Sequence, residues 1–464
     1  MTHFDLVVLG SGPAGEKGAA QAAYFGKKVA LVEKESVLGG AAVNTGTLPS
    51  KTFRETALYL SGYRQRGLFG VDLQLRRAAT SSDFLRRKDI VVREERERIA
   101  INLENHGIER LRGEASFVDA HTLAIRSGAG VEKHITGDFV LVATGSSPVR
   151  PAGYAFDHRR IFDSDEIAGL TELPRALAIV GGGVIGCEYA CLFATMGVQV
   201  TLIDGRQTLL SFLDGEFSKA LMQRMRQLDI ELVLGRKVER CDVDDNAVRL
   251  VLDDGATLVA DDCLVCAGRS GNTAALNLKA VGLSPGPRGD LGVNERYQTA
   301  VPNIYAAGDV VGFPALASTA MEQARIAVVH AFGFEYKTSL APILPYGIYT
   351  IPEVSMAGET EESLATKGVP YVAGVASFGD NARGRIIGDV SGKVKLLFRR
   401  SDMRLLGVHV LGENATELVH VGLTALLCEA TADLFVRMCF NYPTLSEAYK
   451  YATYDALGKV ASSG

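Results

Sequence analysis

The 464-residue sequence contains no tryptophan and only seven cysteines. The cysteines are odd in number and widely spaced, which argues against the disulfide framework of small secreted domains. No apolar run approaches the roughly 20 residues that a membrane-spanning helix needs. The chain opens on a short strand-like segment, residues 4–9, rather than on the core of a signal peptide. We therefore expect a cytoplasmic protein with reduced thiols and no membrane partner.

The sequence also lacks a concentration of charge of one sign. Its formal net charge is −5, and the longest basic run covers only residues 86–88, which argues against a nucleic-acid groove. Cys263 and Cys266 form a CxxC motif, but they lie in a predicted strand, where residues three apart point to opposite faces. Cys187 and Cys191 share one face of a predicted helix, and we interpret them as packing residues. No metal site is expected.

The first 33 residues carry the pattern of a dinucleotide-binding fold. Gly10 permits a tight turn, Gly12 lets backbone amides approach a pyrophosphate, and Gly15 lets the helix pack closely on the strand. The helix N-terminus offers partial positive charge to the phosphates. Glu33 follows Gly15 by 18 residues and is placed to accept hydrogen bonds from a ribose. The elements in order are a strand at 4–9, the turn Gly10-Ser11-Gly12-Pro13-Ala14-Gly15, a helix at 16–25 and a strand at 28–32.

Residues 177–204 repeat this pattern. A strand at 177–180 leads into the turn Gly181-Gly182-Gly183-Val184-Ile185-Gly186, then a helix to about residue 196 and a strand at 198–203. Asp204 ends the unit, again 18 residues after the last glycine of the turn. Two such units imply two bound dinucleotides. Asp204 suits the free ribose hydroxyls of NAD, and Arg206 either neutralises the 2′-phosphate of NADP or is a solvated turn residue.

The segment at residues 38–51 reads LGGAAVNTGTLPSK. It resembles the redox-active loop of the pyridine nucleotide-disulfide oxidoreductases, such as lipoamide dehydrogenase, glutathione reductase and mercuric reductase, which usually reads GG-x-C-x4-C-x-PSK. Gly39, Gly40 and Lys51 fit this frame. Ala42 and Thr47 occupy the two cysteine positions, and neither side chain can form a thiolate or accept an electron pair. The frame of the loop is therefore present without its disulfide.

The resemblance continues along the chain in the order of that family. A strand followed by Ala-Thr-Gly at 139–145 matches its second signature, and Asp309 takes the position of an acid that holds the ribityl chain of FAD. The segment at 440–447, FNYPTLSE, places Tyr442 where disulfide reductases have a histidine, while Glu447 keeps the acid. FNYPT and GTLPSK are similar to the soluble transhydrogenase branch of the family, although some members of that branch keep the cysteine that Ala42 replaces.

This resemblance implies an α/β fold with two Rossmann-like dinucleotide-binding domains, for FAD and for NAD(P), and an α+β C-terminal dimerisation domain. We expect the FAD-binding domain at 1–150, the NAD(P)-binding domain at 151–272, a second FAD-binding part at 273–342 and the interface domain at 343–464. The assembly is expected to be a homodimer or a larger oligomer.

The resemblance also assigns residues to the site. Lys51 is expected to lie near flavin N5 and to pair with Glu188, while Tyr442 and Glu447 complete the catalytic set; Tyr442 fills the vacated pocket, bonds to solvent or binds an acceptor. The expected FAD-binding residues are Gly10, Gly12, Pro13, Ala14, Gly15, Glu33, Lys34, Gly39, Gly40, Ala42, Thr47, Lys51, Ala115, Thr144, Gly145, Asp309 and Ala317. Those for NAD(P) are Gly181, Gly183, Val184, Ile185, Gly186, Asp204, Arg206, Val238 and Gly268.

The implied activity is hydride transfer between NADPH and NAD through FAD, by a ping-pong mechanism with no redox disulfide. A diaphorase, which reduces quinones or dyes with NAD(P)H, would use the same sites and remains the alternative. A third hypothesis is a catalytically idle flavoprotein subunit, which an intact pair of Lys51 and Glu188 disfavours. Without the two thiols, reduction of lipoamide or glutathione is not expected.

Overall fold

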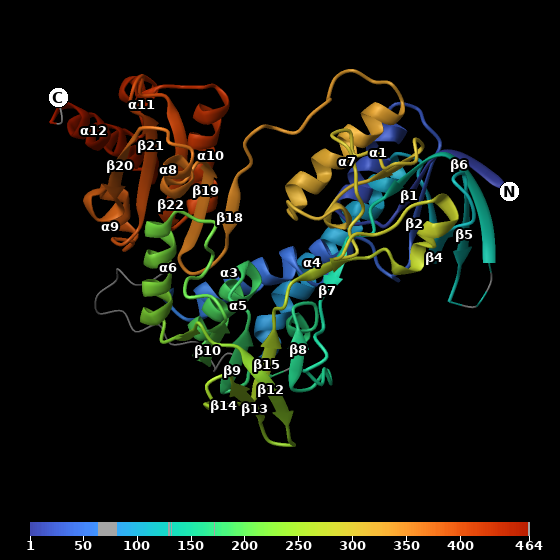
Figure 1. The fold of residues 1–464 in the computed structure, drawn as a ribbon, viewed down its shortest axis with the longest axis horizontal. Coiled ribbons are helices and arrows are strands. Elements are labelled where there is room, and N and C mark those ends of the chain that lie inside the picture. The colour runs from blue at the N-terminus through green and yellow to red at the C-terminus, as the bar shows by residue number, and fades with distance from the viewer. Residues whose placement is uncertain (64–80, 129, 131, 171, 463–464) are drawn as a thin grey trace.

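The computed structural model describes residues 1–63, 81–128, 130, 132–170 and 172–462. The chain forms three bodies, one built from the N-terminal region and a later segment, one from the middle of the chain, and one from the C-terminal region (Figure 1). Within the described residues, no helix has both the length and the apolar character needed to span a membrane.

The first body is a three-layer α/β unit. Its sheet has the order β3-β2-β1-β6-β5-β4, with β17 paired to β6. The strands β3, β2, β1, β6 and β17 are parallel, whereas β5 and β4 add an antiparallel edge. The elements are β1 (Thr2–Leu9), α1 (Pro13–Tyr24), β2 (Val29–Glu33), α2 (Gly40–Asn44), α3 (Thr47–Leu60), α4 (Ser81–Asn105), β3 (Glu109–Arg112), β4 (Glu114–Phe117), β5 (Thr122–Arg126), β6 (Glu132–Val142), β17 (Ile304–Ala306) and α7 (Ala317–Ala331).

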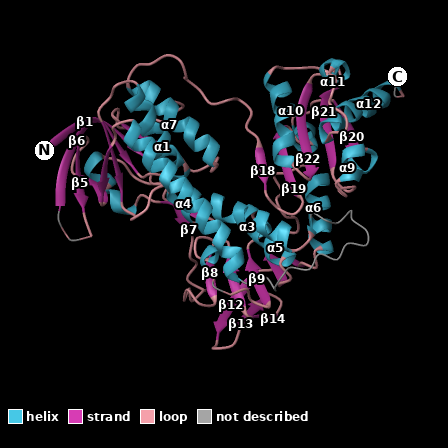
Figure 2. Cartoon of the chain, turned by 180° about the vertical axis from the view of Figure 1, so that it is seen from behind, coloured by secondary structure: helices cyan, strands magenta, loops and turns pink. Residues whose placement is uncertain are grey.

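The apolar run of β1 is buried on both sides, as a central parallel strand requires. Helices α1 and α7 lie side by side against one face of the sheet (Figure 2). Pro13 is the first residue of α1. Its missing N–H costs no hydrogen bond there, because the first N–H groups of a helix have no partner within the helix. The chain returns to this sheet through β17, which pairs with β6.

The second body repeats the first. Its sheet, β11-β10-β9-β15-β8, is entirely parallel, and an antiparallel sheet β12-β13-β14 lies beside it. Glu33 and Asp204 are the last residues of β2 and β10, as the repeat predicted. The elements are β7 (Ser146–Pro148), β8 (Ile161–Asp163), β9 (Ala176–Val180), α5 (Val184–Thr195), β10 (Gln199–Asp204), α6 (Gly215–Gln227), β11 (Glu231–Leu234), β12 (Val238–Val243), β13 (Val248–Leu252), β14 (Thr257–Ala260), β15 (Asp262–Val265) and β16 (Arg269–Gly271), of which β7 and β16 pair with each other.

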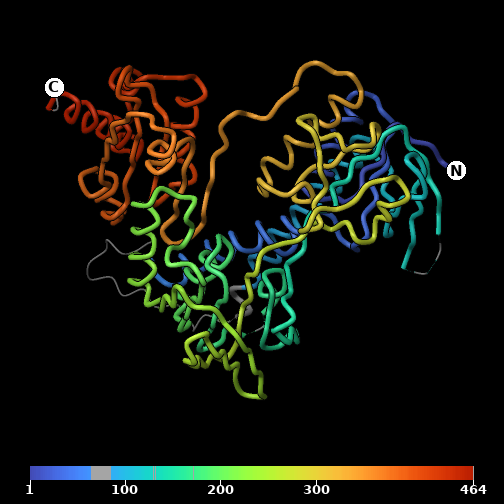
Figure 3. Tube along the Cα trace, viewed as in Figure 1, coloured from blue at the N-terminus to red at the C-terminus, as the bar shows by residue number. Residues whose placement is uncertain are grey.

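The third body is an antiparallel sheet, β18-β19-β22-β21-β20, covered by helices. The chain reaches it from α7 by a long connection, which Figure 3 shows as an open trace between the two bodies. The elements are β18 (Tyr346–Ile348), β19 (Glu353–Gly358), α8 (Glu361–Thr366), β20 (Tyr371–Ser377), α9 (Ala382–Ile386), β21 (Lys393–Arg399), β22 (Leu405–Gly412), α10 (Ala415–Leu427), α11 (Ala432–Arg437) and α12 (Ala448–Ala461).

A buried ionic cluster joins the second and third bodies. Lys395 of β21 is almost fully buried, and its ammonium lies 3.0 Å from Asp214, the N-cap residue of α6, and 3.1 Å from Glu216. Glu361 at the start of α8 contacts the same ammonium. Because a buried charge is costly without partners, this cluster ties α6 to the C-terminal sheet.

The structure corrects the interpretation of residues 38–51 as a loop. Helix α2 and the first turn of α3 occupy most of this segment. Helix α2 begins at Gly40, and Gly39 and Gly40 have φ values of 101° and 56° that favour glycine. The segment is short and has no clear apolar periodicity, so its helical character was not visible in the sequence. The charged stretch that ends at residue 105 belongs to helix α4.

Cys263 and Cys266 lie against opposite faces of the second sheet, in separate apolar clusters, as strand geometry predicted. Burial raises the pKa of both thiols. Cys187 and Cys191 are fully buried in α5 and pack in the core, also as expected.

Asp262 at the start of β15 is expected to oppose folding at neutral pH. It is 8% exposed, and burial raises its pKa to about 6, against the opposing effect of Arg160 at 3.4 Å. In the unfolded chain its pKa is about 3.9. The ionised carboxylate therefore costs at most about 3 kcal/mol of stability above pH 6, and this cost disappears as the pH falls from about 6 to 4. Asp262→Asn should raise the melting temperature at pH 8 and leave it unchanged at pH 4, measured by circular dichroism.

Asp261 provides the matched control for this measurement. Burial acts to raise its pKa, but hydrogen bonds from Ala176 and Arg175 outweigh it and hold the pKa below its ordinary value. Asp261→Asn should therefore lower stability at pH 8. Equal melting shifts for Asp262→Asn at both pH values would contradict the assigned burial cost.

Candidate active site

A cavity of about 1130 Å³ lies between the first glycine turn, the helices α2 and α3, and the start of α5. This volume exceeds that of common small-ligand pockets and suits a dinucleotide. The predicted FAD-binding residues that line it are Gly10, Gly12, Pro13, Ala14, Glu33, Lys34, Gly40, Ala42, Thr47, Lys51, Ala115, Thr144, Gly145, Asp309 and Ala317. Gly15 and Gly39 are not on its surface. They pack behind it.

The backbone segments around the first glycine turn approach so closely that side chains at its glycines would clash with backbone atoms. A Cβ atom on Gly10, whose φ is 102°, would lie 2.4 Å from the carbonyl oxygen of Ala143. A Cβ atom on Gly40 would lie 2.9 Å from the Cα atom of Gly12. A Cβ atom on Gly15 would lie 1.8 Å from the carbonyl oxygen of Gly10. The close approach of these backbone segments leaves amide groups at the N-terminus of α1 open to a phosphate.

Acidic residues lie at two points of the cavity wall. Glu33 accepts hydrogen bonds from the Ser11 amide at 2.9 Å and the Ser11 hydroxyl at 2.6 Å. Asp309 accepts one from the Ser146 hydroxyl at 2.8 Å. Both carboxylates are held in place by the protein and remain on the cavity surface, where ribose and ribityl hydroxyls could reach them.

Three buried hydroxyls of residues that line the cavity have no hydrogen-bond partner among the residues that the structure describes: those of Thr45, Thr144 and Tyr189. Buried polar groups are normally paired, so a polar ligand in the cavity would supply what they lack. Burial raises the pKa of Tyr189, which keeps its hydroxyl protonated and able to donate. The residues present therefore fit a bound flavin dinucleotide.

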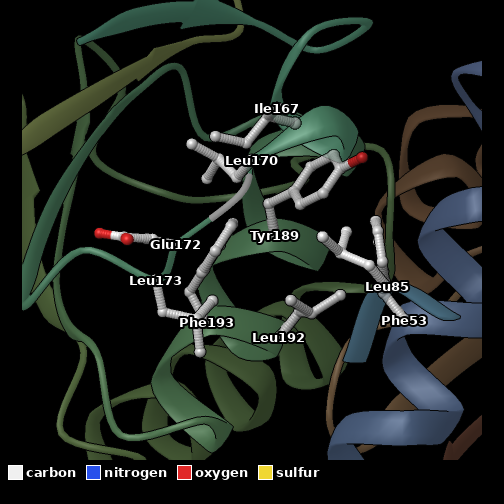
Figure 4. A pocket seen from close by; sticks show the side chains of 9 residues that line it. All are labelled: Phe53, Leu85, Ile167, Leu170, Glu172, Leu173, Tyr189, Leu192 and Phe193. Atoms are coloured by element: carbon white, nitrogen blue, oxygen red, sulfur yellow. The ribbon is translucent and has the colours of Figure 1, made fainter. Parts of the chain in front are cut away.

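Tyr189 also borders a second, small cavity of about 10 Å³ (Figure 4). Apolar side chains such as Phe53 and Phe193 dominate its wall, with Glu172 at one side. This volume barely admits one water molecule. The small cavity is a packing defect beneath the site and cannot hold a substrate.

Lys51 and Glu188 meet at the large cavity, although 137 residues separate them. The Nζ atom of Lys51, on α3, lies 2.7 Å from Oε2 of Glu188, on α5. The Tyr349 amide donates to Oε1 of Glu188 at 2.9 Å, and the Lys51 ammonium lies 4.8 Å from the centre of the Tyr349 ring. The Lys51 side chain is 28% exposed and that of Glu188 10%. The pair is therefore fixed and can still be reached by a ligand.

The second glycine turn has the same geometry as the first. A Cβ atom on Gly181, whose φ is 108°, would lie 2.3 Å from the Cys266 carbonyl oxygen, and one on Gly186 only 1.9 Å from that of Gly181. Gly183, at the N-terminus of α5, faces open space. Val184 and Ile185 line the large cavity, and the other predicted NAD(P) residues lie outside it. The second nucleotide site thus opens toward the first.

Asp204 and Arg206 form a two-pronged ion pair. The Nε atom of Arg206 lies 2.8 Å from Oδ1 of Asp204, and its Nη2 atom lies 2.7 Å from Oδ2. Oδ2 also accepts a hydrogen bond from the Gly182 amide at 2.6 Å. Burial acts to raise the pKa of Asp204, but these hydrogen bonds outweigh it and hold the pKa below its ordinary value. Arg206 is therefore not a free turn residue in this structure.

Tyr442 and Glu447 lie in the C-terminal body and do not line the cavity of their own chain. The Tyr442 side chain is 76% exposed, so within one chain it fills no pocket. A single chain brings Lys51 and Glu188 together but not Tyr442 and Glu447 with them.

Several residues of the cavity wall were not predicted from the sequence. Arg269 lines it and donates to the Ser146 hydroxyl at 2.9 Å and to Asp165 at 2.7 Å. It begins β16 and directly follows Gly268, one of the predicted NAD(P) residues, so its position was a usable signal. Tyr189 and Tyr349 had no such signal, because only the packing of α5 and of the segment that follows β18 brings them to the site.

No thiol is available at the cavity. All seven cysteines fall in the described part of the chain, and none lines the cavity. Ala42 and Thr47 do line it, where the resembling family has its disulfide.

Comparison with known proteins agrees with this geometry. The family model "pyridine nucleotide-disulphide oxidoreductase" matches residues 4–324, and its dimerisation domain matches residues 344–453. A soluble pyridine nucleotide transhydrogenase of Mycobacterium tuberculosis is 43% identical over 99% of this chain and 98% of its own.

Two solved structures are similar over nearly their full lengths, each at 26% identity. LpdA of M. tuberculosis has a TM-score of 0.90 and covers 98% of this chain and 99% of its own. The HOCl-induced flavoprotein disulfide reductase RclA of Escherichia coli has a TM-score of 0.87, with coverage of 96% and 98%. The chain therefore belongs to the pyridine nucleotide-disulphide oxidoreductase family, and within it to the group of the soluble pyridine nucleotide transhydrogenases.

Proposed function

We propose that this protein transfers hydride between NADPH and NAD through bound FAD, by a ping-pong mechanism at one nicotinamide site and without a redox disulfide. The observation that carries the proposal is one cavity that is lined by the first glycine turn, by Val184 and Ile185 of the second turn, and by the pair of Lys51 and Glu188, but by no thiol. Bound FAD would accept a hydride from one nicotinamide nucleotide and return it to another.

The chain's own residues bind and orient the two nucleotides. The first glycine turn and α1 hold one pyrophosphate, and Glu33 and Asp309 accept hydrogen bonds from sugar hydroxyls. The second turn and α5 hold the other pyrophosphate, and Val184 and Ile185 lie where that site meets the cavity. Such positioning removes much of the entropic barrier to transfer.

Lys51 supplies a fixed positive charge to the site. Glu188 and the Tyr349 ring restrict its ammonium, which can then stabilise negative charge that develops on a ligand. Glu188 acts through Lys51 and is a positioning residue.

We further propose a cytoplasmic homodimer. The match to the family's dimerisation domain supports pairing through residues 344–453. In such a dimer the exposed Tyr442, with Glu447, would be contributed to the partner's cavity. We also propose that the domain boundaries lie at residues 150, 272 and 342. The pairing of β17 with β6 in the first sheet and of β8 with β15 in the second sheet supports these boundaries.

A steady-state assay that pairs NADPH with thio-NAD tests the proposal. Reduced thio-NAD should form in step with NADPH loss, and double-reciprocal plots at several NADPH concentrations should be parallel, as a ping-pong mechanism requires. Intersecting lines would contradict the shared site. Quinone consumption that is much faster than thio-NAD reduction would instead favour the diaphorase.

A further inference from the structure

Three basic side chains gather where β10 and β11 end, beside the second nucleotide site. The two strands are parallel and adjacent, with Asp204 opposite Leu234. The Gly235 amide donates to the Arg206 carbonyl at 3.0 Å, and the Arg236 amide donates to the Asp204 carbonyl at 3.2 Å. Residues 235–237 therefore lie directly against residues 204–206.

Two of these three cations already have carboxylate partners. Arg206 is paired in two-pronged fashion with Asp204. Arg236 lies 3.0 Å from Asp254 and 3.9 Å from Asp253. Neither guanidinium offers an uncompensated charge to a ligand.

Lys237 is the third cation, and it differs from the other two. Its aliphatic stem crosses Gly205, because a Cβ atom on Gly205 would lie 3.4 Å from both Cγ and Cε of Lys237. The side chain is exposed. Among the residues that the structure describes, no carboxylate lies within 4.0 Å of its ammonium. Lys237 thus places an ammonium that has no carboxylate partner among the described residues over the residue between Asp204 and Arg206.

We propose that Lys237 binds the 2′-phosphate of NADP(H) and so allows one site to accept both nucleotides. The inference deepens the proposed function and rests on its use of both NAD and NADP. Asp204 by itself would accept hydrogen bonds from the ribose of NAD and repel a 2′-phosphate. Arg206 cancels the charge of Asp204, and Lys237 adds the positive charge that a phosphate needs. With NAD, Lys237 stays in solvent at little cost.

Adenosine 2′,5′-bisphosphate and 5′-AMP are suitable probes, because they differ in the 2′-phosphate and contain no nicotinamide. Isothermal titration calorimetry of the FAD-loaded protein should show that Lys237→Ala weakens binding of the bisphosphate about 10- to 100-fold and leaves 5′-AMP binding unchanged. Lys237→Arg should restore most of the affinity. Lys219→Ala, which removes an exposed lysine of α6, is the control and should bind both probes like the wild type.

Three outcomes would overturn the inference. One is unchanged bisphosphate binding in Lys237→Ala. Another is an equal loss for both probes, which would indicate a structural role. The third is that Arg206→Ala abolishes the selectivity for the bisphosphate over 5′-AMP, whereas Lys237→Ala retains that selectivity. Because no hydride transfer is measured, a selective loss in Lys237→Ala would stand even if the thio-NAD assay failed, and the two proposals can therefore fail separately.

Discussion

Lys51→Met is expected to slow the reduction of bound FAD by NADPH by about 10²- to 10³-fold, the effect of removing one preorganised charge from a site. Methionine keeps most of the volume of lysine but carries no charge, so packing between α3 and α5 should persist. The change also leaves Glu188 without its partner at 2.7 Å, which adds unfavourable negative charge at the cavity. Stopped-flow absorbance of the FAD-loaded protein under anaerobic conditions measures the rate.

The controls separate a local effect from a general one. Lys133→Met removes an exposed lysine that lies 3.6 Å from Glu109 on the first sheet, and the rate should not change. Glu188→Gln should slow the reaction less than Lys51→Met, and the double variant should lose less than the sum of the two free-energy changes, because the residues act as a pair. A wild-type rate in Lys51→Met would remove Lys51 from the proposed machinery.

Gly186→Ala is expected to abolish binding of nicotinamide nucleotides while the protein keeps its flavin colour. The new Cβ atom would lie 1.9 Å from the carbonyl oxygen of Gly181, so the start of α5 would have to move away from the turn that holds the pyrophosphate. The first site is built from other residues and should remain. Absorbance at the flavin maximum, together with titration of 5′-AMP by calorimetry, measures the two sites separately.

Two further alanine variants serve as controls for Gly186→Ala. Gly15→Ala, with a Cβ atom 1.8 Å from the Gly10 carbonyl oxygen, should give a colourless protein. Gly458→Ala lies on helix α12 with nothing within 4 Å of the added atom, and it should bind both ligands and gain up to about 1 kcal/mol of stability. Nucleotide binding that survives in Gly186→Ala would show that close packing at this glycine is not required.

The repeated dinucleotide-binding unit could be predicted from the sequence because the interactions that define it join residues close together in the chain. A strand, a tight glycine turn and a helix N-terminus are contiguous in the chain, so spacing alone placed Gly10, Gly181, Glu33 and Asp204 correctly at strand ends and turns. In contrast, α2 was missed, because a single turn of helix has no periodicity to detect.

By itself, the sequence determined that two dinucleotide folds follow one another and that the dithiol is absent at Ala42 and Thr47, since both conclusions depend on residue type and spacing. Only the tertiary structure decided which distant groups meet. It brought Lys51 to Glu188 and Tyr349 and paired Arg206 with Asp204. It also laid Lys237 across Gly205, where no carboxylate of the described residues pairs with its ammonium. These contacts join separate strands and helices, and they depend on how those elements pack rather than on any segment of the chain alone.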